Sequence, residues 1–392
     1  MEEKALKILF LAKWYPNRFD SMLGLFVQRH AEAVSKYAHV NVISVVTVPK
    51  LNDVYEVQTK TIKNLSEIII YTRKAKSFLS PLNTIINGWR YIAAHLAAWK
   101  ILQSTDFIPD ITHVHVLTRA GIIALFFKIR YKVPYVITEH WSRYMQHHDG
   151  YNGLFRKKLT EKIVRYSSGI STVSNVLKQA MIAANINHRN WQIIPNVVDV
   201  YSFKPDNNLK SEKFRFSHIS CFEEQSKNMR GILDAVKILK DKNLDFELVM
   251  IGDGQDWEDT VRYSKELGLD DVVSFTGVLE GDKLISMMNT CHCSIIFSFY
   301  ETFSIVIPEN LACGIPVIAT SVGGIPEVLP VDFGKLIPSN DIKALAEAMK
   351  AMMTEETTYD KEAMIQYVED HFSYSEVGFR FVRMYREALL KS

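Results

Sequence analysis

Short apolar segments alternate with amphipathic segments along the whole chain, and this alternation limits the folds that the chain can adopt. Near-continuous apolar strands separated by helices are typical of a parallel sheet with helices on both faces. We therefore predict an α/β protein. The predicted strands are Lys7–Ala12, Val40–Val46, Glu67–Tyr71, Ile111–Val116, Tyr135–Thr138, Gly169–Val173 and Trp191–Ile194, followed by Phe214–Ile219, Phe246–Ile251, Val272–Thr276, Cys293–Phe297 and Val317–Ala319.

An interruption near the middle of the chain indicates two domains. Around residues 196–208, Pro195, Pro205 and a polar run break the pattern of strands and helices. A chain of 392 residues also suits two domains better than one. We predict one Rossmann-like domain over residues 1–200 and a second over residues 201–373. They would face each other across a cleft at the carboxyl ends of both sheets, where open α/β sheets bind ligands.

Charge is divided unevenly between the two halves. Residues 1–200 contain 26 Lys and Arg against 13 Asp and Glu, a net charge of +13, whereas residues 201–392 sum to −11 and the whole chain to +2. Basic residues gather at 73–76 and 156–158. Such a surface attracts anionic lipids or phosphorylated acceptors, although a solvated helix face is the simpler interpretation of any single cluster. We expect no nucleic-acid partner, because the excess of basic residues is the only feature that favours one and no nucleic-acid-binding motif accompanies it.

Targeting patterns and cysteines point to the cytoplasm. No stretch approaches the roughly 18 apolar residues of a membrane span, and the first residues lack the pattern of a secretory signal. Cys291 and Cys293 are too closely spaced for the usual zinc site. Alternation along a strand would place both thiols on one buried face. With Cys221 and Cys313 they are expected to stay reduced.

Two glutamates and a glycine loop form the motif with the most chemical content. Glu301 follows the strand Cys293–Phe297, and Glu309 lies in the first turn of the next predicted helix, Glu309–Cys313. Free N–H groups at a helix start suit a diphosphate or a sugar hydroxyl, and the carboxylates can accept from ribose and sugar hydroxyls. A pair of helix-capping acids is the alternative. The following Gly323–Gly324 loop favours ligand binding.

These residues resemble the signature of the retaining glycosyltransferases of family 4, which have the GT-B fold. The pattern is E-x7-E followed by A-C-G-x-P-V-I-A-T-x-x-G-G-x-P-E. Further segments match family landmarks in the same order over nearly the whole chain. They are Trp14–Pro16, Gly24–Phe26, Pro109–His115, Thr138–His140, Val173–Ser174, Ile194–Asp199, Phe203–Pro205, Lys227–Asn228, Ile251–Gly254, Val273–Gly277 and Gly334–Ile337. The resemblance also implies a C-terminal helix, over residues 374–392, that packs back on the first domain.

The resemblance assigns expected roles in the second domain. Glu309 would hold the ribose of the nucleotide, and Glu301 would face the donor sugar. Lys227 would stabilise the charge that develops on the departing nucleoside diphosphate. Gly277 belongs to the same donor-binding set. The backbone N–H groups of Phe303, Ser304 and Ile305 would face the sugar and the diphosphate, and Thr302 belongs to the same donor-binding set.

In the first domain the resemblance points to a glycine and a histidine. Gly24 matches a glycine in the first loop, where the backbone approaches the phosphates. His140 matches a histidine near the sugar and the acceptor, and a structural histidine is the alternative. The resemblance implies that His140, Glu301 and Lys227 are the catalytic residues.

A metal is not expected. His113 and His115 alternate on a strand and therefore share a face, so a metal site that includes the nearby Glu139 is conceivable. No DxD-like acidic pair occurs in the candidate loops. We predict no catalytic metal and no other cofactor, with the UDP- or GDP-linked donor as a substrate.

One departure from the family pattern concerns the diphosphate. Many members carry a Gly-Arg pair before the lysine, whereas this chain has Cys221 and Phe222, followed by two glutamates. Either the missing cation comes from Arg230 or Arg143, or the diphosphate is held more weakly.

The leading prediction is a retaining hexosyltransferase that moves a sugar from a nucleotide-sugar donor to a hydroxyl of a glycan or lipid-linked acceptor, as in cell-surface polysaccharide biosynthesis. The basic first domain suits peripheral contact with the inner face of the plasma membrane. Trp89, Tyr91 and Trp99 are candidate anchors, or else part of a core stripe. The alternatives are a sugar-nucleotide epimerase of the same fold and a catalytically silent nucleotide-sugar-binding protein.

Overall fold

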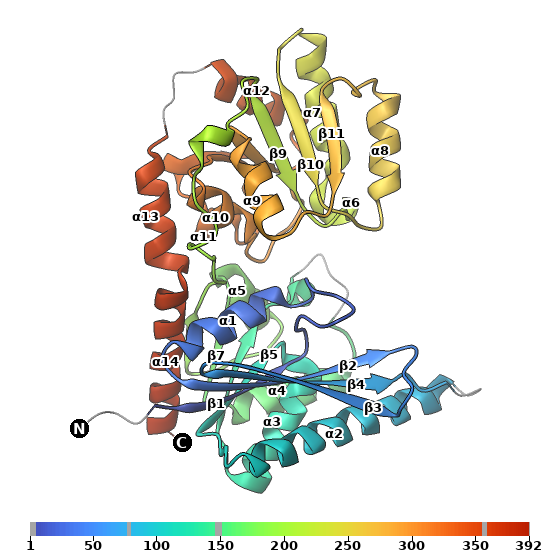
Figure 1. Ribbon diagram of the computed structural model, residues 1–392, viewed down its shortest axis with the longest axis vertical. Coiled ribbons are helices and arrows are strands. Elements are labelled where there is room, and N and C mark those ends of the chain that lie inside the picture. The colour runs from blue at the N-terminus through green and yellow to red at the C-terminus, as the bar shows by residue number, and fades with distance from the viewer. Residues whose placement is uncertain (1–4, 77–79, 146–150, 355–358, 392) are drawn as a thin grey trace. The chain divides into compact units, whose positions relative to one another are not determined.

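The computed structural model describes residues 5–76, 80–145, 151–354 and 359–391. The chain forms two compact units: unit 1 comprises residues 1–197 and 374–392, and unit 2 comprises residues 198–373 (Figure 1). Each unit contains one sheet of mainly parallel strands between helices. The predicted α/β class with two Rossmann-like domains is therefore confirmed.

Unit 1 is built on a sheet with the strand order β3-β4-β2-β1-β5-β6-β7-β8. The strands are β1 Lys7–Ala12, β2 His39–Val48, β3 Tyr55–Ile62, β4 Leu65–Arg73, β5 Ile111–His115, β6 Tyr135–Glu139, β7 Gly169–Thr172 and β8 Trp191–Ile193. Neighbours are parallel except β3 and β4, which form an antiparallel hairpin at one edge. The sequence pattern did not predict β3, because its side chains are almost all exposed and form no apolar run.

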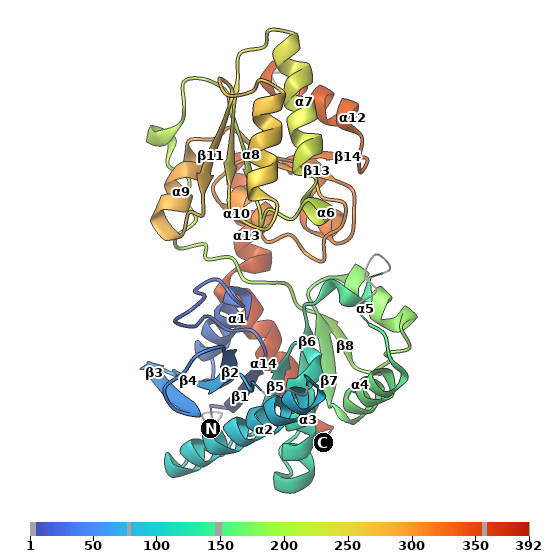
Figure 2. The same cartoon turned by 90° about the vertical axis from the view of Figure 1, so that its right-hand side faces the viewer.

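Helices cover both faces of this sheet (Figure 2). They are α1 Leu25–Ser35, α2 Ser80–Ser104, α3 Leu117–Tyr131, α4 Leu154–Tyr166, α5 Asn175–Ala183 and α14 Tyr374–Leu390. Although α14 is the last helix of the chain, it packs against α1 in unit 1. There Phe381 and Tyr385 share a core with Phe10 and Val42.

The close packing of α14 on α1 predicts a stability effect at Gly378. A Cβ atom added there would lie 2.3 Å from the carbonyl oxygen of Ala33 in α1. We expect Gly378→Ala to lower the free energy of unfolding by about 1–3 kcal/mol, although alanine is the better helix former. Gly88→Ala in α2 is the matched control, because a Cβ there meets no atom within 4 Å. The control should stabilise by roughly 0.5–1 kcal/mol. Unchanged urea unfolding of Gly378→Ala would contradict the packing.

Unit 2 contains a parallel sheet with the order β11-β10-β9-β12-β13-β14. Its strands are β9 Arg215–Ile219, β10 Glu247–Ile251, β11 Val273–Gly277, β12 Cys293–Ile296, β13 Val317–Thr320 and β14 Gly334–Ile337. Its helices are α6 Glu224–Lys227, α7 Met229–Asp241, α8 Trp257–Glu266, α9 Gly281–Asn289, α10 Val306–Ala312, α11 Ile325–Val328, α12 Ile342–Thr354 and α13 Lys361–Phe372. Of these strands, the apolar pattern left out only β14, which is short and begins with glycine.

Burial decides between several interpretations of the sequence. Cys291 and Cys293 are buried free thiols, as expected, although Cys291 precedes β12 instead of lying in it. Tyr91 and Trp99 are core residues, whereas Trp89 is 68% exposed. No helix in the described ranges is long and apolar enough to cross a membrane.

Candidate functional site

The loop between β12 and α10 holds the first glutamate of the motif. Oε1 of Glu301 accepts a hydrogen bond from the Ser298 hydroxyl at 3.1 Å and lies 2.5 Å from Nζ of Lys227. The side chains of this ion pair are only 12% and 18% exposed, respectively. Two residues that are far apart in the sequence, and that were both expected at the donor, are thus in direct contact.

The Gly323–Gly324 loop supports the backbone of Glu301. The N–H of Gly324 donates to the Glu301 carbonyl oxygen at 3.0 Å. Gly323 has a φ of 52°, and a Cβ added there would lie 1.9 Å from the same oxygen. Only glycine suits this backbone conformation at so close an approach. The two parts of the sequence motif therefore form one substructure.

The segment after Glu301 presents backbone donors. Phe303 is buried, with its ring 5.8 Å from that of Phe372, and Ser304 adopts a φ of 60°. Toward the rest of the described chain, the N–H groups of Phe303, Ser304 and Ile305 donate no hydrogen bond. These groups are available to a ligand beside the Lys227–Glu301 pair. Thr302 is half-buried in the same segment.

Glu309 is buried in the first turn of α10. The helix begins at Val306, earlier than the predicted start at Glu309, and the N–H of Glu309 donates to the Ile305 carbonyl at 3.2 Å. The predicted helix was too short because the apolar residues before Glu309 read as part of the loop. Glu309 therefore lies about one helical turn after Ile305, the last residue with a free N–H group.

Lys227, the last residue of α6, keeps its charge despite its burial. Burial lowers the pKa of Lys227, but the attraction of the Glu301 carboxylate and its hydrogen bond more than offset this effect. The net result is a pKa above the ordinary value. The site therefore holds a fixed ammonium group at neutral pH, and such a group can stabilise negative charge on a ligand.

Cys221 and Phe222, which replace the family's Gly-Arg pair, have different surroundings. Phe222 is fully buried in the core of unit 2, with its ring 4.8 Å from that of Trp257. Cys221 is exposed, and its proximity contributes to the raised pKa of Lys227. Of the suggested replacement cations, Arg230 lies over the ring of Tyr263 and Arg143 is buried in unit 1.

The residues of unit 2 that were expected to bind the nucleotide-sugar donor share one edge of its sheet. Lys227 follows β9, Gly277 ends β11, Glu301 follows β12 and Gly323 follows β13. Because the strands are parallel, all four positions lie at the carboxyl edge, where open α/β sheets bind ligands. The Gly277 carbonyl also accepts from the N–H of Gly252 at 2.9 Å, which joins the neighbouring turns.

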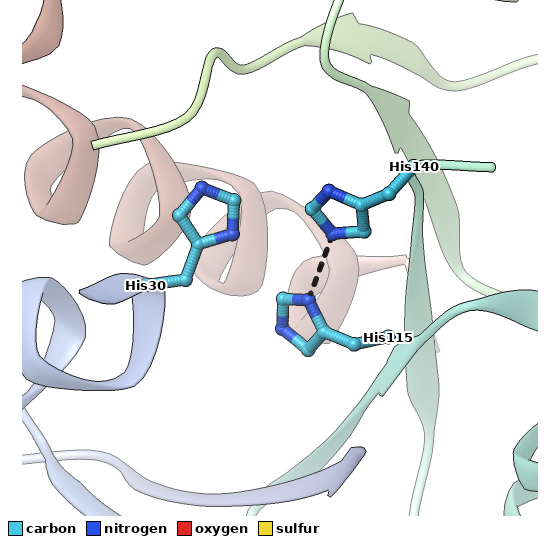
Figure 3. A group of neighbouring side chains, drawn as sticks. All are labelled: His30, His115 and His140. Carbon is cyan, nitrogen blue, oxygen red and sulfur yellow. Dashed lines mark hydrogen bonds between the residues drawn. The ribbon is translucent and has the colours of Figure 1, made fainter. Parts of the chain in front are cut away.

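In unit 1, His140 belongs to a buried cluster of three histidines (Figure 3). It follows β6, and its Nε2 lies 3.2 Å from Nδ1 of His115 in β5. His30 of α1 directs a ring nitrogen at this pair. Burial lowers the pKa of His30 to about 4 and those of His115 and His140 well below 6.5, so the cluster is uncharged at neutral pH.

This cluster differs from the metal set suggested by the sequence. His113 instead contacts the hydroxyl groups of Thr138 and Tyr385, at 2.6 and 2.7 Å, and Glu139 accepts hydrogen bonds from three backbone N–H groups. The three clustered rings each bring one nitrogen within 4.8 Å of the others. Three imidazoles are a donor set that Zn²⁺ takes, so these residues could hold a metal. That no metal takes part in catalysis stays a prediction.

Lys13 is a further candidate site residue in unit 1, and it belongs to none of the sequence motifs. It follows β1, and its Nζ lies 3.8 Å from the ring centroid of Trp141. Burial, together with the nearby Arg143 guanidinium, lowers the pKa of Lys13 to about 8. Its position in the sequence, directly after a strand and therefore at the carboxyl edge of the sheet, could have marked it as a candidate site residue.

The backbone of unit 1 explains why position 24 is a glycine. It precedes α1 with a φ of 71°, and a Cβ there would lie 2.4 Å from the carbonyl oxygen of Trp14. Glycine is therefore required where these two loops of unit 1 meet. Its approach to the phosphates stays a prediction.

Two family models match the chain. The model "Glycosyl transferases group 1" matches residues 201–371, and "Glycosyltransferase Family 4" matches residues 59–201. The matches meet at residue 201 and together extend over residues 59–371.

Curated relatives are distant. The chain is 24% identical over 237 residues to the gpi3 subunit of phosphatidylinositol N-acetylglucosaminyltransferase of Schizosaccharomyces pombe, over 58% of this chain and 51% of that protein. It is 25% identical to N-acetyl-alpha-D-glucosaminyl L-malate synthase of Bacillus anthracis, over 59% of this chain and 57% of that protein. The matches thus span little more than half the length of these relatives.

Solved structures resemble the whole chain. Sucrose-phosphate synthase from Thermosynechococcus elongatus has a TM-score of 0.77 at 16% identity, with 99% of this chain and 100% of that chain covered. Anabaena HepE in complex with UDP and glucose has a TM-score of 0.70 at 16% identity, with 96% and 98% covered. At this identity the likeness shows a shared fold, that of the GT-B glycosyltransferases.

Proposed function

Because this chain belongs to the family 4 glycosyltransferases, which have the GT-B fold, we propose that it transfers a hexose from a nucleoside-diphosphate sugar to an acceptor hydroxyl with retention of configuration. The observation that carries the proposal is the largely buried Lys227–Glu301 ion pair beside the free N–H groups of residues 303–305. This arrangement offers a cation to a diphosphate and a carboxylate to a sugar within one loop system.

The chemistry follows from charge development. As the sugar–phosphate bond breaks, the leaving diphosphate gains negative charge, and the fixed ammonium of Lys227 stabilises that charge. Glu301 holds this ammonium in place and is positioned to accept from a sugar hydroxyl. The leaving phosphate oxygen takes the proton of the acceptor hydroxyl, so attack occurs on the face that the diphosphate leaves. Positioning and electrostatics are then the main work of the protein.

The donor and the acceptor side are divided between the units. Glu309 holds the ribose of a UDP- or GDP-linked donor in unit 2, and His140 lies at the acceptor side in unit 1. The acceptor is a glycan or a lipid-linked compound. The basic character of unit 1 favours peripheral contact with an anionic membrane.

Glu309→Ala tests the donor site. Loss of a charge-assisted hydrogen bond to the ribose should raise the dissociation constant of a nucleoside diphosphate about 10- to 150-fold, which corresponds to about 1.5–3 kcal/mol. Isothermal titration with UDP and GDP measures it. Because Glu309 is buried, Glu309→Gln serves as a second variant of nearly equal volume. The exposed Glu347→Ala in α12 is the matched control.

Three results would count against the proposal. If both Glu309 variants bound the nucleotides as wild type does, the donor site would lie elsewhere. If nucleotide sugars were converted into isomers without any acceptor, the epimerase would be the better assignment. Nucleotide binding without transfer to a panel of acceptors would favour the silent binding protein.

A further inference from the structure

A pocket of about 680 Å³ in unit 1 has a strongly basic lining. It lies where β2 and β4 end, and because these strands are parallel, their carboxyl ends share the ligand-binding edge of the sheet. The acidic residue in the lining is Glu56. The basic residues are Arg18, Lys50, Arg73, Lys74, Lys76 and Arg90. The lining therefore has a net charge of +5.

Most of this charge is not neutralised by the protein. Glu56 pairs with Arg18 at 2.6 Å, and Arg90 donates to the carbonyl oxygen of Arg73, which fixes its guanidinium at the pocket wall. Within the described ranges, no carboxylate pairs with Lys50, Lys74 or Lys76. Several cations around one cavity suit a group with more than one negative charge, such as a phosphate or a diphosphate.

An apolar groove of about 220 Å³ adjoins the basic pocket. Val54, just before β3, and Tyr55 of β3 line it on one side, and α2 lines it with alanines at 93, 94 and 97. Arg90 lines both the pocket and the groove. A ligand that occupied both would therefore have an anionic head and an apolar chain.

The N-terminal half of α2 exposes an apolar face. Leu82, Ile85, Trp89 and Ile92 are 43%, 57%, 68% and 37% exposed, respectively. Their spacing places them on one side of the helix. The opposite side packs on β4 and β2 (Figure 1). Exposed apolar residues close to a basic surface, here the lining of the pocket, are typical of protein surfaces that contact a membrane interface.

We propose that the basic pocket and the adjoining groove bind the phosphate or diphosphate head and the first part of the chain of a membrane lipid, and that this lipid carries the acceptor hydroxyl. The proposal rests on the proposed function, because it names the acceptor of that transfer. Charge complementarity selects an anionic lipid, and the exposed face of α2 contacts the bilayer around it.

Vesicle binding by the full chain tests the proposal. Wild-type protein should co-sediment with phosphatidylcholine vesicles that contain phosphatidic acid, only weakly with pure phosphatidylcholine, and less as salt is raised. Lys74→Ala/Lys76→Ala should weaken binding about 30-fold, because each lysine near an anionic surface contributes about a factor of five. The matched control is Lys343→Ala/Lys350→Ala, which removes two exposed lysines from α12 of unit 2 and should bind as wild type.

A second pair of variants tests the apolar part. Ile85→Ser should weaken binding about fivefold, whereas Ile129→Ser in α3, at a residue of similar exposure, should not. Inorganic diphosphate is the soluble probe, and it should compete with vesicles only at concentrations far above those of the lipid. Competition at equal concentration, together with wild-type behaviour of Ile85→Ser, would assign the pocket to a soluble phosphorylated acceptor and overturn the proposal. Equal binding to neutral and anionic vesicles would overturn it as well.

Failure here can be separated from failure of the proposed function. Titration of the same preparations with UDP and GDP measures the donor site without any lipid. If Glu309→Ala weakened nucleotide binding while Lys74→Ala/Lys76→Ala bound vesicles as wild type does, the transferase would stand and only this acceptor would be rejected.

Discussion

Lys227→Ala is expected to lower the turnover number about 100- to 1000-fold, the effect of removing one fixed group that stabilises developing charge. The ammonium group lies 2.5 Å from Glu301 and keeps its charge, because burial lowers its pKa but the Glu301 carboxylate, its hydrogen bond and the nearby Cys221 together raise it by more. Without it, the departing diphosphate would lose this cation and would face the Glu301 carboxylate. Steady-state transfer from a nucleotide sugar measures the change.

Stability must be separated from catalysis in this experiment, because Lys227→Ala leaves Glu301 shielded and unpaired. The double variant Lys227→Ala/Glu301→Gln removes both charges and should unfold at a higher temperature than Lys227→Ala. It should nevertheless turn over no faster. The control Lys237→Ala removes a lysine whose partner, Asp241, lies on an exposed part of α7, and it should be close to wild type. Full activity of Lys227→Ala would disprove the assigned role.

Phe222→Ala is expected to lower the free energy of unfolding of unit 2 by about 3–5 kcal/mol. The side chain is completely buried in the core of unit 2 and contacts Trp257. Its backbone hydrogen bonds with Asp253 and Asp256 remain in the variant, so the loss reflects the cavity and the lost contacts. Hydrogen exchange of unit 2 peptides under increasing denaturant measures it, with unit 1 peptides as an internal reference.

A second substitution tests what this position faces. Phe222→Arg would bury a guanidinium in the core and should destabilise at least as much, without tightening nucleotide binding. Phe379→Ala, at a residue 53% exposed in α14, is the control for loss of a phenyl ring and should have a small effect. A stable Phe222→Arg variant with tighter nucleotide binding would show that the side chain faces the ligand edge and not the core.

Local patterns predicted most of the framework. Most of the strands are rich in apolar residues, so β1, β2 and β4 to β13 were recognised from the sequence. The edge strand β3 was missed because one sheet edge is exposed and polar residues suffice there. The start of α10 was placed too late, because its first turn is apolar and is preceded by a loop with no capping side chain.

The sequence by itself determined the class of the fold, the family resemblance and the identity of the motif residues, because strand periodicity, glycine turns and charged residues after strands are local properties. Only the tertiary structure decided which distant residues meet. In the fold, Lys227 pairs with Glu301, and His30 lies beside His115 and His140. Phe222 packs in the core of unit 2. The tertiary structure also joined Arg18 and Arg90 to the basic segment 73–76, because a strand order that differs from the chain order brings separate loops to one sheet edge. No local pattern records that order.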